Sequence, residues 1–140
     1  RAFLPTVITQ ALVSDVVRVG SLDPVRDMNF VEDTVAGYLL AATAPGVEGQ
    51  VINLASGRGA SMGEILEIAL RATGRSPRVE VEAARVRPEK SEVMELIGSA
   101  ARARELLGWQ SRVSLEEGVA RTAAWIGDHL GDYKPQLYTI

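Results

Sequence analysis

The stretch VINLASGRGASMGEILEIAL, residues 51–70, joins a short apolar segment, a glycine-bearing loop and a segment with helical periodicity. Its first residues have the continuous apolar character of a buried strand. After Met62, apolar side chains recur at the spacing that places them on one face of a helix: Ile65, Ile68, Ala69 and Ala72. A strand followed by a helix in this way is the repeating unit of α/β folds.

Similar patterns predict the remaining elements. Short strands are expected in VVRVG (16–20), QVINLA (50–55) and PRVEV (77–81). Helices are expected in the first turns of the chain, from caps at Asp33 and Ser99, from Met62, and from the capping box SLEE at 114–117. We therefore predict a partial α/β fold over residues 1–140, with about three or four short strands and about four or five helices. That is too few strands for a complete doubly wound sheet.

Composition excludes several classes of function. The 140 residues suffice for one domain with a core, and 18 acids outnumber 15 lysines and arginines, which argues against a nucleic-acid-binding protein. The absence of cysteine excludes disulfides and thiolate metal sites and suits a cytoplasmic protein. No apolar run approaches the roughly 18–20 residues of a membrane span. The chain begins with Arg1, as expected of one that starts within a gene, is processed or is designed.

The loop from Gly57 to Gly63 resembles a dinucleotide-binding fingerprint, but its third glycine comes one residue late. Ser61 and Glu64 fit a capping box, which would occupy the free N–H groups that a phosphate needs. The Glu64 carboxylate would also repel an anion. The spacing therefore favours a structural turn, and a dinucleotide site at this loop stays the alternative.

Two arginine-bearing loops are better candidates for phosphate chemistry. In DPVRDMNFVED, Arg26 has Asp27 beside it to orient the guanidinium. In RVRPEKSEV, Arg85, Arg87 and Lys90 lie within six residues. Arginine donates in a planar fork suited to phosphate oxygens, so the two loops could hold a diphosphate. The alternative is two solvated loops with local ion pairs that contribute little.

The order of three segments resembles the C-terminal half of extended short-chain dehydrogenases/reductases, the NAD(P)-dependent nucleotide-sugar epimerases and 4,6-dehydratases. These segments are RVGSLDPVRDMNFVEDTVAGYLLAA (18–42), QVINLASG (50–57) and the run from RVRPEKSEV to RTAAWI (85–126). RDMNFVEDTV matches the family's Arg-Asp-aromatic-x-aromatic-Val-x-Asp element, with Met28 in place of the first aromatic. The RPEKSEV loop and the tail YKPQLYTI favour the 4,6-dehydratase branch.

The resemblance implies that the chain binds a nucleoside diphosphate sugar. By position, Arg26 would contact the diphosphate, Arg87 would be a second phosphate ligand and Glu92 would bind the ribose. Phe3 and Leu4 fall in the segment that lines the base pocket. Arg87 lies two residues farther from Glu92 than in the epimerases, and the family's aromatic before Gly20 is absent.

The family's catalytic elements are absent from this sequence. It contains no N-terminal glycine-rich cofactor loop and no Tyr-x-x-x-Lys pair, since Tyr38 is followed four residues later by Ala42. We therefore expect no catalytic residue and no cofactor in this chain. The resemblance implies NAD(P) for the full-length parent, held by a missing N-terminal cofactor domain.

The resemblance also implies that the segment from RDMNFV to QVINLA packs against that missing domain. The intervening helix would then expose its apolar face, Val35, Tyr38, Leu39 and Ala42, and the chain would self-associate. Besides the dinucleotide site at the loop from Gly57 to Gly63, two alternatives remain. The chain could be a stand-alone nucleotide-binding or regulatory module without catalysis, or a small α/β interaction domain in which Arg26, Arg87 and Glu92 pair with one another.

Overall fold

The computed structural model describes residues 2–86 and 91–134. The chain divides into two units, and each is described by itself. The first unit comprises Arg1–Pro24, Ser61–Met94 and Val119–Ile140, and the second comprises Val25–Ala60 and Glu95–Gly118. Helices and short strands alternate in the described residues, which confirms the predicted α/β class.

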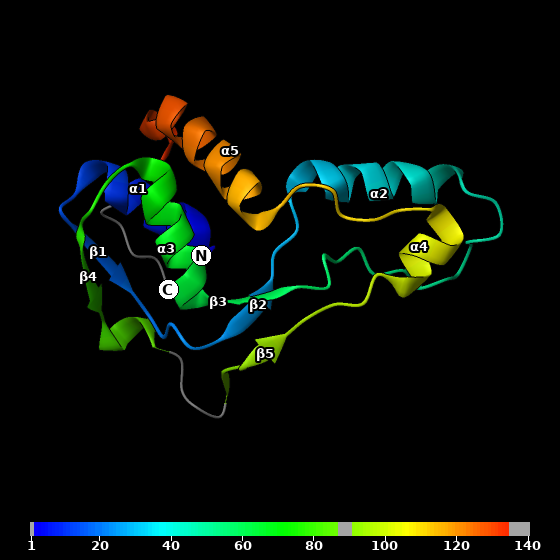
Figure 1. Cartoon of the computed structure of the whole chain (residues 1–140), viewed down its shortest axis with the longest axis horizontal. Helices are drawn as coiled ribbons and strands as arrows, with labels where there is room; N and C mark the ends of the chain where they lie inside the picture. Colours follow the sequence, from blue (N-terminus) through cyan, green and yellow to red (C-terminus); the bar gives the residue numbers. More distant parts are fainter. Residues whose placement is uncertain (1, 87–90, 135–140) are drawn as a thin grey trace. The chain divides into compact units, whose positions relative to one another are not determined.

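The first unit is built on a pair of parallel strands (Figure 1). Strands β1 (Val16–Val19) and β4 (Arg78–Val81) pair with Val17 opposite Val79. Helices α1 (Phe3–Val13) and α3 (Met62–Thr73) pack side by side. The short 3-10 helices η1 (Ala83–Arg85) and η3 (Leu130–Asp132) and most of α5 (Leu115–Asp128) complete the unit.

The core of the first unit is aliphatic. Its least exposed large side chains come from the three helices and β1: Val7, Ile8, Val17, Ile65, Val119 and Ile126. Burying each such side chain stabilises the fold by about 1.5–3 kcal/mol. Of the predicted helical face, Ile65, Ile68 and Ala69 are buried, whereas Ala72 at its end is exposed, so the face is confirmed for its first three residues only.

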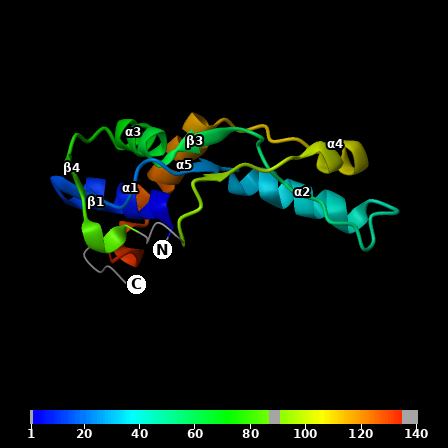
Figure 2. The same cartoon turned by 90° about the horizontal axis from the view of Figure 1, so that it is seen from below.

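The second unit holds the strand order β3-β2-β5, formed by β3 (Gly59–Ser61), β2 (Val25–Asp27) and β5 (Glu95–Leu96). Strands β2 and β5 are parallel, with Arg26 opposite Leu96. Helices α2 (Val31–Thr43) and α4 (Ala101–Leu107) lie side by side (Figure 2).

Three sequence predictions about these elements are wrong. Residues 50–55 form no strand, because no neighbouring segment among the described residues supplies a ladder partner. The segment instead places the Leu54 side chain against Gly37, where an added Cβ would lie 2.4 Å from Leu54 Cδ1. The N-cap of α2 is Phe30 rather than Asp33, and that of α4 is Ala100 rather than Ser99. Neither of these two caps makes a side-chain hydrogen bond.

Other boundary predictions are confirmed. Ser61 and Glu64 form the full capping box at the start of α3, and Gly74 ends that helix in the left-handed conformation with φ 66°. Such a φ favours glycine because it lacks a Cβ. Ser114 caps α5 by accepting the Glu117 N–H at 3.1 Å. Within residues 2–86 and 91–134, none of the helices has the length and apolarity needed to cross a membrane.

Candidate functional site

Arg26 occupies the middle of β2 and is half-buried. Its Nη1 donates to the Val25 carbonyl at 2.9 Å, so part of the guanidinium is held against its own strand. Because successive side chains of a strand point to opposite faces, Arg26 and Asp27 leave β2 in opposite directions.

The sequence suggested that Asp27 orients the Arg26 guanidinium, but the hydrogen bonds of the Asp27 carboxylate come from two other segments. Its Oδ1 accepts the Ser56 N–H at 3.0 Å and the Ser56 hydroxyl at 2.5 Å. Its Oδ2 accepts the Gly57 N–H at 2.9 Å and the Gly98 N–H at 3.2 Å. One carboxylate thus joins β2 to two segments that are distant in the sequence.

The glycine-bearing loop after residue 55 has internal anions at both ends. The Asp27 carboxylate accepts hydrogen bonds from the N–H groups of Ser56 and Gly57. At the other end, the Ser61 N–H donates to Glu64 Oε2 at 2.7 Å. Hydrogen bonds from the Ser61 N–H and then from its hydroxyl hold the pKa of Glu64 below its ordinary value. These contacts support a structural turn and do not fit a cofactor phosphate at this loop.

The remaining predicted ligands fall in the first unit or outside the described residues. Phe3 and Leu4 form the first turn of α1 and are half-buried. Glu92 is half-buried as well, and it has an interaction partner. Arg87, like Lys90, lies outside the described residues. The structure therefore places Arg26 in one unit and Phe3, Leu4 and Glu92 in the other.

Arg85, the first basic residue of the predicted phosphate loop, has an acidic partner nearby in the sequence. Its Nε lies 2.5 Å from Glu82 Oε2, and its side chain is 14% exposed. This pair belongs to the first unit and matches the local ion pairing of the alternative interpretation.

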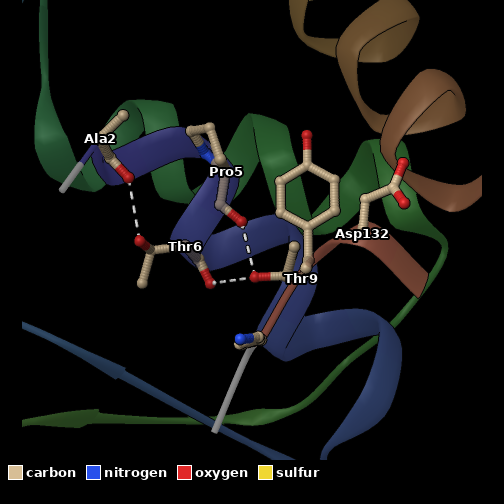
Figure 3. A pocket seen from close by; sticks show the side chains of 7 residues that line it. Ala2, Pro5, Thr6, Thr9 and Asp132 are labelled. Atoms are coloured by element: carbon tan, nitrogen blue, oxygen red, sulfur yellow. Dashed lines mark hydrogen bonds between the residues drawn. The ribbon is translucent and has the colours of Figure 1, made fainter. Parts of the chain in front are cut away.

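A cavity of about 270 Å³ lies beside the first turns of α1 in the first unit (Figure 3). Its lining residues come from near both chain ends: Ala2, Pro5, Thr6, Thr9, Asp132, Tyr133 and Lys134. The Thr6 hydroxyl donates to the Ala2 carbonyl at 2.9 Å, and the Thr9 hydroxyl donates to the Pro5 carbonyl at 2.7 Å. The helix itself therefore uses these hydroxyl protons. Sequence reasoning missed this cavity because its two sides are more than a hundred residues apart.

The buried carboxylate of Asp33, which the sequence predicts to cap a helix, instead binds residues 111–113 of the second unit. Asp33 Oδ2 accepts the N–H groups of Arg112 and Val113, both at 3.0 Å, and the Ser111 hydroxyl at 3.2 Å. Burial raises the pKa of Asp33, but these hydrogen bonds outweigh burial and hold the pKa below its ordinary value. The Trp109 indole N–H donates to the Asp33 carbonyl at 2.8 Å, which adds a second tie to α2.

In the part of the chain that the structure describes, the single histidine belongs to no cluster that could bind a metal ion. The exposed His129 ring stacks on Trp125 with 4.2 Å between centroids, and its Nδ1 lies 2.8 Å from the Trp125 carbonyl oxygen. Among residues 2–86 and 91–134, no group of three or more His, Asp or Glu side chains could hold a metal.

A family model and a relative of known activity each match most of this chain. The family model described as GDP-mannose 4,6 dehydratase matches residues 2–122. The UDP-glucose 4-epimerase of Streptomyces lividans is 40% identical over 93 residues, which cover 65% of this chain and 27% of that protein.

Solved structures share the fold. An epimerase from the thermophilic methanogen Methanothermobacter thermautotrophicus matches with a TM-score of 0.84 and 27% identity, covering 94% of this chain and 38% of that one. MoeE5 in complex with UDP-glucuronic acid and NAD matches with a TM-score of 0.80 and 25% identity, covering 91% of this chain and 42% of that one. The chain therefore spans less than half the length of each of these relatives.

Proposed function

Because the chain belongs to the GDP-mannose 4,6 dehydratase family, we propose that it is the nucleotide-sugar-binding C-terminal portion of an NAD(P)-dependent sugar-nucleotide epimerase or 4,6-dehydratase. The observation that carries the proposal is the Arg26–Asp27 element. Arg26 lies on a strand whose next residue is fixed by four hydrogen bonds. A guanidinium on a fixed strand is suited to bind a diphosphate in a defined orientation.

The proposed roles follow the chemistry of each side chain. Arg26 and Arg87 neutralise the diphosphate charge and donate to its oxygens. Glu92 accepts hydrogen bonds from ribose hydroxyls. Phe3 and Leu4 supply apolar contact to the base. The parent reaction would begin with hydride abstraction from C4 of the sugar, for which this chain supplies binding and orientation.

The cofactor is assigned to the part of the parent protein that this chain does not include. MoeE5 was solved with NAD, and that protein is more than twice as long as this match. The loop from Gly57 to Gly63 does not fit a cofactor phosphate, since the N–H groups of Gly57 and Ser61 donate to the Asp27 and Glu64 carboxylates and those of Met62 and Gly63 donate to backbone carbonyls. We therefore assign NAD(P) to the parent alone and expect no turnover by this chain.

The exposed apolar face of α2 supports the proposal that a further domain of the parent protein packs against this chain. Tyr38 and Leu39 are 68% and 65% exposed, while Asp33 and Gly37 on the opposite side of the helix are buried. Apolar side chains clustered on one helix face mark an interaction surface. We assign this face to the absent cofactor domain of the parent, and in the isolated chain to a second copy.

The test is a calorimetric titration of the chain with UDP-, GDP- and dTDP-glucose, with NADH as the cofactor control. We expect one sugar nucleotide to bind and the Arg26→Ala and Arg87→Ala variants to weaken that binding by at least about tenfold. Arg104→Ala, which removes an exposed arginine from α4, is the matched control and should leave binding unchanged. Binding of NADH alone, or equal binding by all variants, would contradict the proposal and favour the interaction-domain alternative.

A further inference from the structure

The Asp27 carboxylate accepts four hydrogen bonds from donors in two other segments. The donors are the N–H groups of Ser56, Gly57 and Gly98 and the Ser56 hydroxyl. Hydrogen bonds to an ionised acceptor are shorter and stronger than neutral ones. The carboxylate therefore acts as an internal anion in a nest of backbone amides.

The backbone around this nest is shaped to reach Asp27. Gly57 adopts φ 75°, a conformation that side-chain-bearing residues rarely take. An added Cβ at Gly98 would lie 2.5 Å from the Ala55 Cβ, so a larger residue would push the Gly98 segment away. Both glycines thus allow their N–H groups to approach the same carboxylate.

We infer that Asp27 is a positioning residue for Arg26, acting through the backbone of β2 rather than through direct pairing. Asp27 fixes one face of a three-residue strand, and Arg26 leaves the opposite face. A strand this short has few ladder bonds to hold its twist, so its orientation depends on this anchor. The inference rests on the proposed function for its consequence, the binding of a diphosphate by Arg26.

Asp27→Asn tests the inference directly. The substitution replaces one oxygen by an NH₂ group, so that two donors face each other on one side of the nest. Nuclear magnetic resonance of the whole chain should show amide exchange at Gly57 and Gly98 faster by at least about tenfold. It should also show a shifted or broadened Arg26 Nε–H signal. Asp23→Asn, which neutralises an exposed carboxylate four residues earlier, is the matched control and should change neither signal.

Ser56→Ala provides a milder variant in case Asp27→Asn does not fold. It removes the hydroxyl that donates to Asp27 Oδ1 at 2.5 Å. The Arg26 Nε–H signal should shift or broaden in this variant as well. An Arg26 signal that is unchanged in both variants would overturn the inference, whether or not the chain binds nucleotide.

Binding measurements separate the inference from the proposed function. Asp27→Asn should raise the dissociation constant for UDP by about tenfold in the wild-type background and leave it unchanged in the Arg26→Ala background, because the two residues act as one unit. An equal loss in both backgrounds would overturn the positioning role. A wild-type chain that binds no nucleotide would overturn the proposed function, while the Arg26 Nε–H signal would still decide the role of Asp27.

Discussion

At the residue scale, the buried Asp33 carboxylate stabilises the second unit by ordering residues 111–113 around one oxygen atom. Asp33 is 6% exposed, and removing its carboxylate leaves three part-buried donors without this acceptor. We expect Asp33→Ala to lower the free energy of unfolding by about 1–3 kcal/mol. Chemical denaturation measures the loss. Asp33→Asn keeps one oxygen acceptor and should lose less, and equal stability of all three proteins would contradict this account.

The same residue predicts a pH dependence. Hydrogen bonds hold the folded-state pKa of Asp33 below the ordinary value of 3.8, which applies to the unfolded chain. Its contribution is therefore fully present above pH values near 3.8 and is lost as the pH falls through the folded-state pKa. The stability difference between wild type and Asp33→Asn should shrink when denaturation is measured at pH 3 instead of pH 7. A difference that grows on acidification would have the wrong sign.

Substituting two glycines by alanine tests how closely their surroundings are packed, and the expected effects on stability have opposite signs. Gly98→Ala would bring a Cβ to 2.5 Å from the Ala55 Cβ, and the resulting overpacking should cost about 1–3 kcal/mol. Gly127 lies in α5 with nothing within 4 Å of an added Cβ. Gly127→Ala should therefore stabilise the chain by about 0.5–1 kcal/mol. Thermal denaturation of both variants checks the signs, and a stabilised Gly98→Ala would refute the close approach.

The sequence predicts the contacts of some of these residues but not those of others. The Ser61–Glu64 box lies within four residues, so its pattern predicted the geometry. Asp33 was predicted to cap a helix because its partners lie 78 to 80 residues away and leave no local signal. Asp27 was linked to Arg26 by adjacency, whereas strand alternation directs the two side chains apart.

At the element scale, β1 depends on a side chain from α1. The Gln10 side chain accepts the Arg18 N–H at 3.0 Å and donates to the Arg18 carbonyl at 3.2 Å. In the part of the chain that the structure describes, β4 is the strand paired with β1, and these two hydrogen bonds satisfy the Arg18 backbone. We expect Gln10→Leu to lower stability by about 1–3 kcal/mol and to speed amide exchange at Arg18. Gln110→Leu, at an exposed position, is the control, and unchanged Arg18 protection in Gln10→Leu would contradict the role.

The elements that sequence predicted well are those with strong internal periodicity. Helix α3 has a capping box, an apolar face and a C-terminal glycine, and it forms as predicted. The apolar run at 50–55 looks like a buried strand, but a strand also needs a partner, which periodicity cannot supply. In the second unit, the Arg102 side chain instead donates to the Val51 carbonyl at 3.2 Å.

At the scale of the whole molecule, the exposed face of α2 predicts association. Val35, Tyr38 and Leu39 are large apolar side chains without cover in the part of the chain that the structure describes. We expect the isolated chain to self-associate in sedimentation experiments at high concentration. The double variant Tyr38→Lys/Leu39→Lys should shift the chain toward monomer, whereas Ala120→Lys/Ala124→Lys, on exposed positions of α5, should not. A wild-type chain that sediments as a monomer would contradict this assignment.

Family membership could also be predicted from the sequence, because the motifs that indicate the family occur in the expected order along the chain. The family model matches residues 2–122, which include every proposed ligand. The motifs do not show that these ligands are distributed over two units, with Arg26 in one and Glu92 in the other, because a motif records only its own local segment.

The most direct measurement is a titration of the ¹⁵N-labelled chain with UDP, followed residue by residue in its amide spectrum. If the chain is a nucleotide-sugar-binding portion, the signals of Phe3, Leu4, Arg26 and Glu92 will shift together with one dissociation constant. The signals from Gly59 to Glu64 will not shift when NADH is added. No change with UDP, or changes with NADH confined to the loop from Gly57 to Gly63, would contradict the account.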